Sequence, residues 1–198
     1  DIYLVSQLES FRRESGNTAI EQREIYVDFE NLLNLSTHRS LINLRAGRFI
    51  APFGEEYNDR YVMENPLIFH SVSDLWAIDE GIQVFGQQGK WSYAAAIMNG
   101  SQPIFGDANA DKSLVLRVGF EPVNSLYLSA SWMQTGEIDS STERFSEMWI
   151  GNVRFLPIGA AKEFEADLAE IDLIYQWDSG RFAAHLGQAT YRDSESTA

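Results

Sequence analysis

The sequence contains few candidates for catalytic residues. The pairs Glu55-Glu56 and Asp79-Glu80 have the two carboxyl groups that a glycosidase uses as acid and base. Adjacent residues of a strand point to opposite faces, so neither pair is preformed as a catalytic dyad. The sequence has no Gly-x-Ser-x-Gly motif and no phosphate-binding glycine loop. We therefore expect a protein that is not an enzyme.

Possible metal ligands also lack the spacing of a known site. Asp107, Asn109 and Asp111 have the one-three-five oxygen spacing of a calcium loop, which also requires Gly at its sixth position and Glu at its twelfth. Lys112 and Val118 stand there instead, so an exposed Asx-rich turn is the better interpretation. The three histidines lie far apart, without ligand spacing, and each is expected to be solvated or in a loop: His38, His70 and His185. We expect no metal and no cofactor.

Composition excludes further classes of function. The chain has 198 residues, with 29 Asp and Glu against 15 Lys and Arg, and a net charge of -14. Nucleic acid and anionic lipid surfaces both require a basic face, so neither is an expected partner through charge. The absence of cysteine excludes disulfides and thiolate chemistry. An apolar fraction of 44% is too high for a disordered chain.

The elements that must position any site are strands. Apolar residues alternate with small or polar ones, as at Leu114, Leu116 and Val118, and this period of two is typical of a strand with one apolar face. About ten such segments are predicted, at residues 2–11, 24–30, 42–47, 78–85, 91–98, 113–121, 126–133, 149–155, 169–177 and 182–186. No apolar run approaches the ~18 residues of a membrane-spanning helix. A membrane protein with this sequence would therefore be a barrel of short alternating strands.

Three further features favour a barrel over a soluble sheet. The face opposite the apolar one holds small polar residues with sparse charges, which suits a wet lumen better than a fully solvated surface. Short and long connections alternate until residues 156–162 and 178–180, where a short outer loop or a misplaced strand would explain the break. Aromatic residues near strand ends are expected to form girdles at the two membrane interfaces: Trp76, Trp91, Trp132, Trp149, Trp177, Tyr57, Tyr61 and Tyr191.

Charged residues on the less apolar face are the candidate pore-lining residues. Arg45, Arg117 and Arg154 fall on that face of their strands, and Glu170 and Asp172 would face them from a later strand. In a barrel these charges either set ion selectivity or form a lattice of ion pairs that braces the wall, and both roles stay open. A sixth charge, Arg48, falls on the apolar side with Leu44 and Ala46. Arg48 should therefore lie near a rim, or the register slips there.

Several motifs between residues 24 and 100 carry a resemblance. They are Glu-Ile-Tyr-Val-Asp-Phe (24–29), Leu-Ile-Asn-Leu-Arg-Ala-Gly-Arg-Phe-Ile-Ala-Pro-Phe-Gly (41–54), Asn-Pro-Leu-Ile (65–68), Asp-Glu-Gly-Ile (79–82) and Ala-Ile-Met-Asn-Gly (96–100). Together they resemble the outer-membrane porins of the phosphate-selective, O/P-like type and related outer-membrane β-barrels. The match covers well under half of the chain.

The resemblance implies an all-β fold, an antiparallel transmembrane β-barrel in the outer membrane of a Gram-negative bacterium. It implies a channel for passive diffusion of small polar solutes or ions, surrounded by lipid and lipopolysaccharide and assembled as a homotrimer. Such porins are longer than 198 residues, so residues 1–198 are expected to form a single β-barrel domain from a partial chain. Phosphate selectivity in the family depends on a dense run of lumen Arg and Lys, which this acidic sequence does not have.

Two rival interpretations remain. A soluble β-sandwich, such as a carbohydrate-binding module using exposed Trp91 or Trp132, would have the same period of two. That interpretation requires the apolar faces of residues 114–120 and 126–132 to be buried against a second sheet. A barrel that only scaffolds a partner, with an occluded lumen, is the other alternative.

Overall fold

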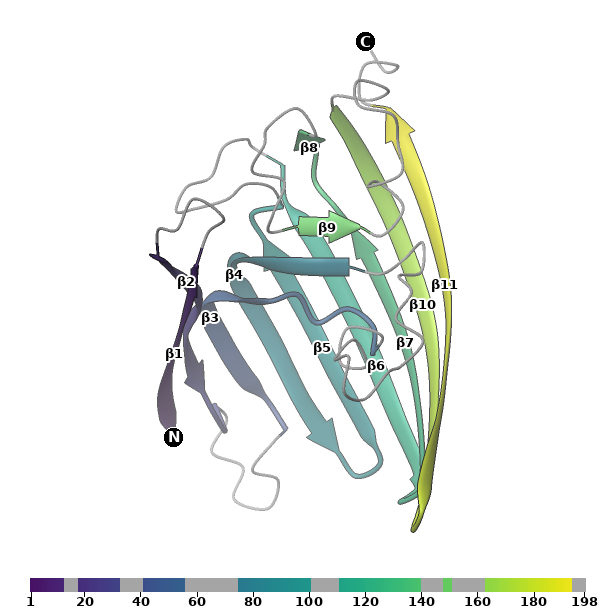
Figure 1. Cartoon of the computed structure of the whole chain (residues 1–198). Helices are drawn as coiled ribbons and strands as arrows, with labels where there is room; N and C mark the ends of the chain where they lie inside the picture. Colours follow the sequence, from purple (N-terminus) through teal and green to yellow (C-terminus); the bar gives the residue numbers. More distant parts are fainter. Residues whose placement is uncertain are drawn as a thin grey trace.

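The computed structural model describes residues 1–12, 18–32, 41–55, 75–100, 111–139, 148–150 and 163–193, and these form one antiparallel sheet with two short additions. Nine strands follow one another in the order β1-β2-β3-β4-β5-β6-β7-β10-β11 (Figure 1). Every neighbouring pair is antiparallel. The all-β antiparallel class predicted from the sequence is therefore confirmed. In the described part of the chain, no helix is long and apolar enough to cross a lipid bilayer.

The strands agree with the predicted segments but are longer at most ends. Their bounds are β1 (Ile2–Arg12), β2 (Thr18–Phe29), β3 (Asn43–Ile50), β4 (Leu75–Gln88), β5 (Trp91–Met98), β6 (Ser113–Val123), β7 (Leu126–Gln134), β8 (Ile138–Asp139), β9 (Met148–Ile150), β10 (Glu163–Trp177) and β11 (Gly180–Asp193). The additional residues of β2 and β11 are mostly polar, so the apolar alternation did not reveal them. In β10 the additional apolar residues, Phe164, Ala166 and Leu168, lie at even positions and belong to the core, whereas the predicted apolar face begins at the odd position Ala169.

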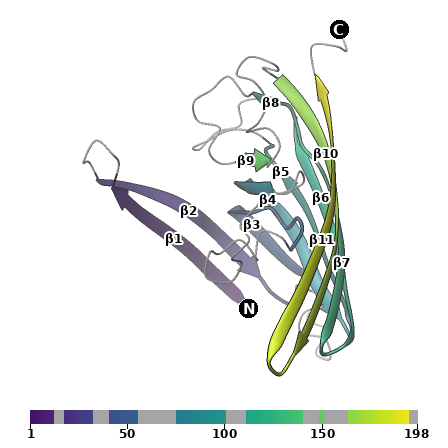
Figure 2. The same ribbon diagram turned by 45° about the vertical axis from the view of Figure 1, so that its right-hand side comes forward.

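The sheet is strongly curved and open. Figure 2 shows β1 and β2 on one side and β10 and β11 on the other, with the remaining strands forming a trough between them. β1 pairs only with β2 and β11 only with β10, so each has one unpaired edge in the described structure. The trough gives the sheet a concave inner face and a convex outer face, and successive residues of each strand alternate between them.

The order of the connections corrects one prediction. The two-residue turns at 89–90, 124–125 and 178–179 all join strands at one end of the sheet, the lower end in Figure 1. The segment predicted as a wall strand at 149–155 does not interrupt this order, because β10 pairs directly with β7. The described part of that segment, β9, instead pairs with residues 75–77 at the start of β4. A misplaced strand therefore explains the apparent break in the alternation of loop lengths.

A small apolar core lies on the concave face, toward the end of the sheet that carries the longer connections. Residues 51–55, which follow β3 and are called the inner segment below, supply Ala51 and Phe53 to it. These two residues are buried together with Phe49, Met98 and Met133 from the surrounding strands. Each fully buried side chain of this size contributes about 1.5–3 kcal/mol, so the core is sufficient to fix the inner segment against the wall.

Candidate functional site on the concave face

Arg117 of β6 is the centre of the polar inner wall. Its Nη2 donates to the Tyr127 hydroxyl at 2.9 Å, its Nη1 donates to the Gly54 carbonyl at 3.4 Å, and it forms an ion pair with Glu55. Gly119, two residues along the same face, leaves the space that the Tyr127 ring occupies. Arg117 therefore connects two wall strands to the inner segment.

The inner segment is bound to the wall by its backbone as well. The Gly54 N–H donates to Ser131 Oγ at 3.0 Å, and the Glu55 N–H donates to Glu170 Oε1 at 3.2 Å. Gly54 has a φ of 64°, and a Cβ there would lie 2.4 Å from Glu170 Oε1. Glycine is required at this position for both reasons. The Pro-Phe-Gly motif thus encodes a turn that brings Glu55 onto the inner wall.

A buried cluster of two carboxylates and a histidine lies beside the inner segment. Asp172 is fully buried, accepting from Ser129 Oγ at 2.6 Å and contacting His185 Nδ1 at 2.7 Å. Glu170 Oε1 lies 4.0 Å from the same imidazole nitrogen. One ligand atom from each residue lies within 4.8 Å of the others, so the three could hold a divalent cation. In this structure Asp172 and His185 bind one another across β10 and β11, and Glu170 Oε1 accepts from the Glu55 N–H.

The position of His185 corrects the prediction that it is solvated or in a loop. His185 lies within β11, directly opposite Asp172 of β10. A signal for this pairing was present in the sequence, because the two-residue turn at 178–179 fixes the register of the hairpin. Counting outward from that turn pairs Trp177 with Gly180 and therefore Asp172 with His185. His38 and His70 lie outside the described residues.

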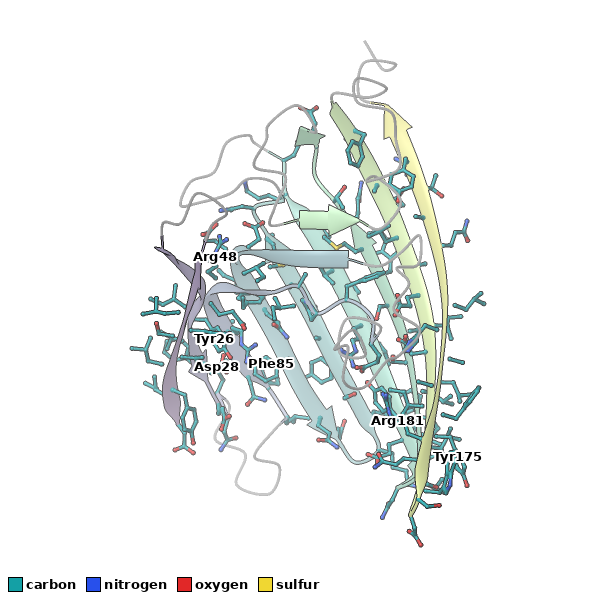
Figure 3. All side chains as sticks on the ribbon, in the orientation of Figure 1. Tyr26, Asp28, Arg48, Phe85, Tyr175 and Arg181 are labelled. Carbon is teal, nitrogen blue, oxygen red and sulfur yellow. The ribbon has the colours of Figure 1, made fainter. Side chains whose placement is uncertain are left out.

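A second charged group occupies the inner face of β2 and β3. Arg45 donates from Nε and Nη2 to the two carboxylate oxygens of Asp28, at 2.7 and 2.8 Å. Its guanidinium lies 3.9 Å from the centroid of the Tyr26 ring and 5.4 Å from that of Phe85. Figure 3 labels the partners Tyr26, Asp28 and Phe85. A bidentate pair stacked on aromatic rings holds the arginine in one orientation. This group is separate from the one centred on Arg117.

Between these two groups the concave wall forms an open cavity of about 390 Å³. Its lining comes from the ends of β2 and β3, from β4, β5 and β6, and from Pro52 of the inner segment. Side chains that line it from the inner faces of the strands are Asn43, Gln83, Phe85, Gln87, Ser92, Ala94 and Arg117. Sequence inspection missed this cavity, because most of its lining residues are neutral and they come from four different strands.

Four of the five predicted pore-lining residues lie on the concave face: Arg45, Arg117, Glu170 and Asp172. They do not face one another as expected, because each arginine pairs with another acid and the two acids bind Ser129, His185 and the inner segment. These are the ion pairs that the bracing role requires, and they form two separate groups. A role in lining a pore stays a prediction. Arg154, Asp107 and Asn109 lie outside the described residues.

Arg48 lies on the apolar side of β3, as the sequence predicted, in line with Ala46 and with Ile82 of the next strand, but it is buried there. The register of β3 runs without a shift through Arg48, which lies opposite Glu80 and donates to its Oε1 at 2.8 Å. Arg48 is 3% exposed. The adjacent Asp79 binds elsewhere, accepting from the Gly100 N–H at 2.6 Å. Asp79 and Glu80 therefore serve separate structural contacts, as expected for neighbouring residues of a strand.

The convex face has the opposite character. Large apolar side chains remain exposed on it in eight of the nine main strands, among them Leu4, Ile82, Ile97, Leu116, Trp132, Ile171 and Leu186. A shallow apolar groove of about 620 Å³ crosses β4 to β7 on this face, with Asn99 and Lys112 at one end. Exposed aromatics gather near the two-residue turns, where Trp91 stacks on Phe120 at 4.3 Å and Tyr175 stacks on Trp177 at 5.7 Å. Tyr191 was predicted to belong to a girdle, but it packs inward against Phe164.

No protein-family model, no curated protein and no solved structure matches this chain. The class of the fold therefore follows from the geometry alone. It is an open, curved, antiparallel sheet of nine strands, with buried charge on its inner face and exposed apolar residues on its outer face.

Proposed function

We propose that this chain is the wall of an outer-membrane β-barrel of a Gram-negative bacterium, a porin-like channel for passive diffusion of small polar solutes or ions. One observation carries the proposal: burial is inverted relative to a water-soluble protein. Asp172 is fully buried on the concave face, whereas Ile97, Leu116 and Ile171 are 50–60% exposed on the convex face. Apolar residues facing outward and polar residues facing inward are the pattern of a barrel in lipid.

The size of the outer apolar surface supports a lipid environment. Water-soluble monomers rarely expose a continuous apolar patch larger than a few hundred Å². Here the exposed apolar side chains extend from Ile2 and Leu4 on β1 to Phe182 and Leu186 on β11. Lipid tails would cover this surface without any loss of hydrogen bonds. Each main strand between the edge strands β1 and β11 is hydrogen-bonded to a neighbouring strand on both sides.

Several strands are long enough to cross a bilayer, whereas β3 and β5, with 8 residues each, are slightly shorter than the usual span. A tilted transmembrane strand requires about 9–11 residues, and β4, β10 and β11 have 14, 15 and 14. The stacked aromatics near the two-residue turns would then lie at one membrane interface. The unpaired edges of β1 and β11 are where a barrel would close, by pairing with each other or with further strands.

The soluble β-sandwich is less well supported. It requires a second sheet over the apolar faces of β6 and β7, yet Leu116 and Val118 are about half exposed in the described structure. The inner face, which would be solvated in a sandwich, instead holds the ion pairs and the inner segment. These features are expected of a lumen wall with an inward-folded segment.

Two measurements test the proposal. The protein refolded from detergent into planar bilayers should show discrete ion conductance, and its migration on a gel should change when the sample is heated. A monodisperse, water-soluble monomer in the absence of detergent would exclude the membrane barrel. Conductance that appears only after removal of a bound protein would favour the scaffold with an occluded lumen.

A further inference from the structure

We propose that the cavity between the inner faces of β3, β4, β5 and β6 is a binding site for a neutral polyhydroxylated solute of monosaccharide size. The inference builds on the proposed function, because the cavity would lie on the wall of the channel. Its volume, about 390 Å³, is in the lower part of the range of small-molecule sites, roughly 300–1,000 Å³.

The lining residues have the chemistry that hydroxyl groups require. Asn43, Gln83 and Gln87 contribute amide groups, and Ser92 contributes a hydroxyl. Amides and hydroxyls both donate and accept hydrogen bonds, so together they can match the mixed donors and acceptors of a polyol. Phe85 adds an apolar ring to the same wall, against which the C–H face of a sugar ring can pack.

Gln83 provides the second, independent observation. It is 93% buried in a wall of the cavity, and its Oε1 has no hydrogen-bond partner among the residues that the structure describes. A buried acceptor without a partner is costly, and such groups in native structures call for an explanation. This oxygen has almost no accessible surface here, so the Gln83 amide must turn toward the cavity before a solute hydroxyl can donate to it.

The charges around the cavity favour a neutral solute over an anion. Arg117, which lines the cavity, is already paired with Glu55, and Arg45 behind Phe85 is paired with Asp28. Glu30 at the end of β2 adds a negative charge to the lining. An anionic solute would have to compete with these carboxylates for the guanidinium groups. The net charge of -14 acts in the same direction.

Binding is tested directly on the detergent-solubilised chain, with D-glucose and inorganic phosphate as probes. The detergent must lack a sugar head group, as lauryldimethylamine oxide does. Saturation-transfer difference NMR should show saturable glucose binding that phosphate does not displace. Gln83→Leu, which removes the amide at similar volume, should weaken glucose binding about tenfold, as expected for a lost hydrogen bond to a buried group. Ala94→Leu, which fills the cavity, should abolish it.

Gln176→Leu is the matched control, because it makes the same change on the inner side of β10, away from the cavity. It should leave glucose binding unchanged. Absence of saturable glucose binding, or equal weakening by Gln83→Leu and Gln176→Leu, would overturn the assignment. Displacement of glucose by phosphate would show an anion site instead.

Conductance of the same preparation separates this inference from the proposed channel. Glucose binding without conductance would leave the site standing and remove the channel. Conductance without glucose binding would support the channel and overturn the binding site.

Discussion

The two faces of this sheet are made by the same strands yet follow opposite rules of burial. On β5, Ala94 lines the polar cavity of the concave face, and its neighbour Ala95 lines the apolar groove of the convex face. On β6, Arg117 forms an ion pair with Glu55, whereas the adjacent Leu116 is half exposed. A period of two alone does not say which face is inside. The location of the charges indicates which face is inside. A buried charge requires a partner, and a large exposed apolar surface requires a non-aqueous neighbour.

The largest expected effect comes from placing a charge on the outer face. Leu116→Arg should destabilise the protein in lipid vesicles by about 2–4 kcal/mol, the cost of a cation near the middle of a bilayer. Val123→Arg, near a two-residue turn, is the control and should cost about 0–1 kcal/mol. Urea unfolding followed by tryptophan fluorescence measures both. Equal, small costs would indicate that water covers both positions.

The converse test removes a charge from the inner face. Arg117→Met should cost about 2–3 kcal/mol, less than the 3–5 kcal/mol of a fully buried pair because the arginine side chain is 22% exposed. The loss follows from leaving the carboxylate of Glu55 buried without its guanidinium partner. Adding Glu55→Gln should recover part of it in the same unfolding assay. A double variant no more stable than Arg117→Met would contradict the bracing role.

A smaller effect is expected where the inner segment meets the wall. Gly54→Ala should cost about 2 kcal/mol, because the methyl group meets Glu170 and the left-handed backbone disfavours alanine. Gly89→Ala is a closely matched control, since its φ is 60° and a Cβ there meets nothing within 4 Å. It should cost only the backbone strain, about 1 kcal/mol. The difference between the stability costs of the two variants measures the contribution of the contact between residue 54 and Glu170. Equal values would mean that the inner segment is not held there.

The smallest expected effect concerns the aromatics near the turns. Trp91 and Phe120 stack across β5 and β6, and such pairs contribute about 0.5–1.5 kcal/mol beyond their burial. A double-mutant cycle of Trp91→Leu and Phe120→Leu should give a coupling energy in that range. A coupling near zero would show that each ring interacts with its surroundings independently, as in a membrane interface without stacking.

Much of the fold was predictable because the sheet is made of local hairpins. The segment predicted at residues 91–98 matches β5 from end to end, and the alternation at Leu114–Val118 placed the outer face of β6 correctly. The strand predicted from residue 149 is present in its described part, β9, but it pairs with the start of β4 and does not stand between β7 and β10. The apolar residues of a segment indicate a strand, but they do not indicate which other strand it pairs with.

The candidate site was less predictable, for a physical reason. The charges at Arg45, Arg117, Glu170 and Asp172 could be assigned to a face, because the period of two fixes that. Their partners depend on register and on residues distant in sequence. Arg117 pairs with Glu55, 62 positions away, only because Gly54 turns the inner segment onto the wall. The pair of Asp172 and His185 is an exception, because both residues belong to one hairpin. Counting residues outward from its two-residue turn predicts that they lie opposite one another.

The central claim is that lipid covers the convex face and water the concave face, and two adjacent alanines test it most directly. The chain has no cysteine, so Ala94→Cys and Ala95→Cys each give a single labelling site. With a spin label in lipid vesicles, position 95 should be accessible to oxygen dissolved in the bilayer and position 94 to a water-soluble nickel reagent. A label at position 95 that is as accessible to the nickel reagent as the label at position 94 would contradict the account.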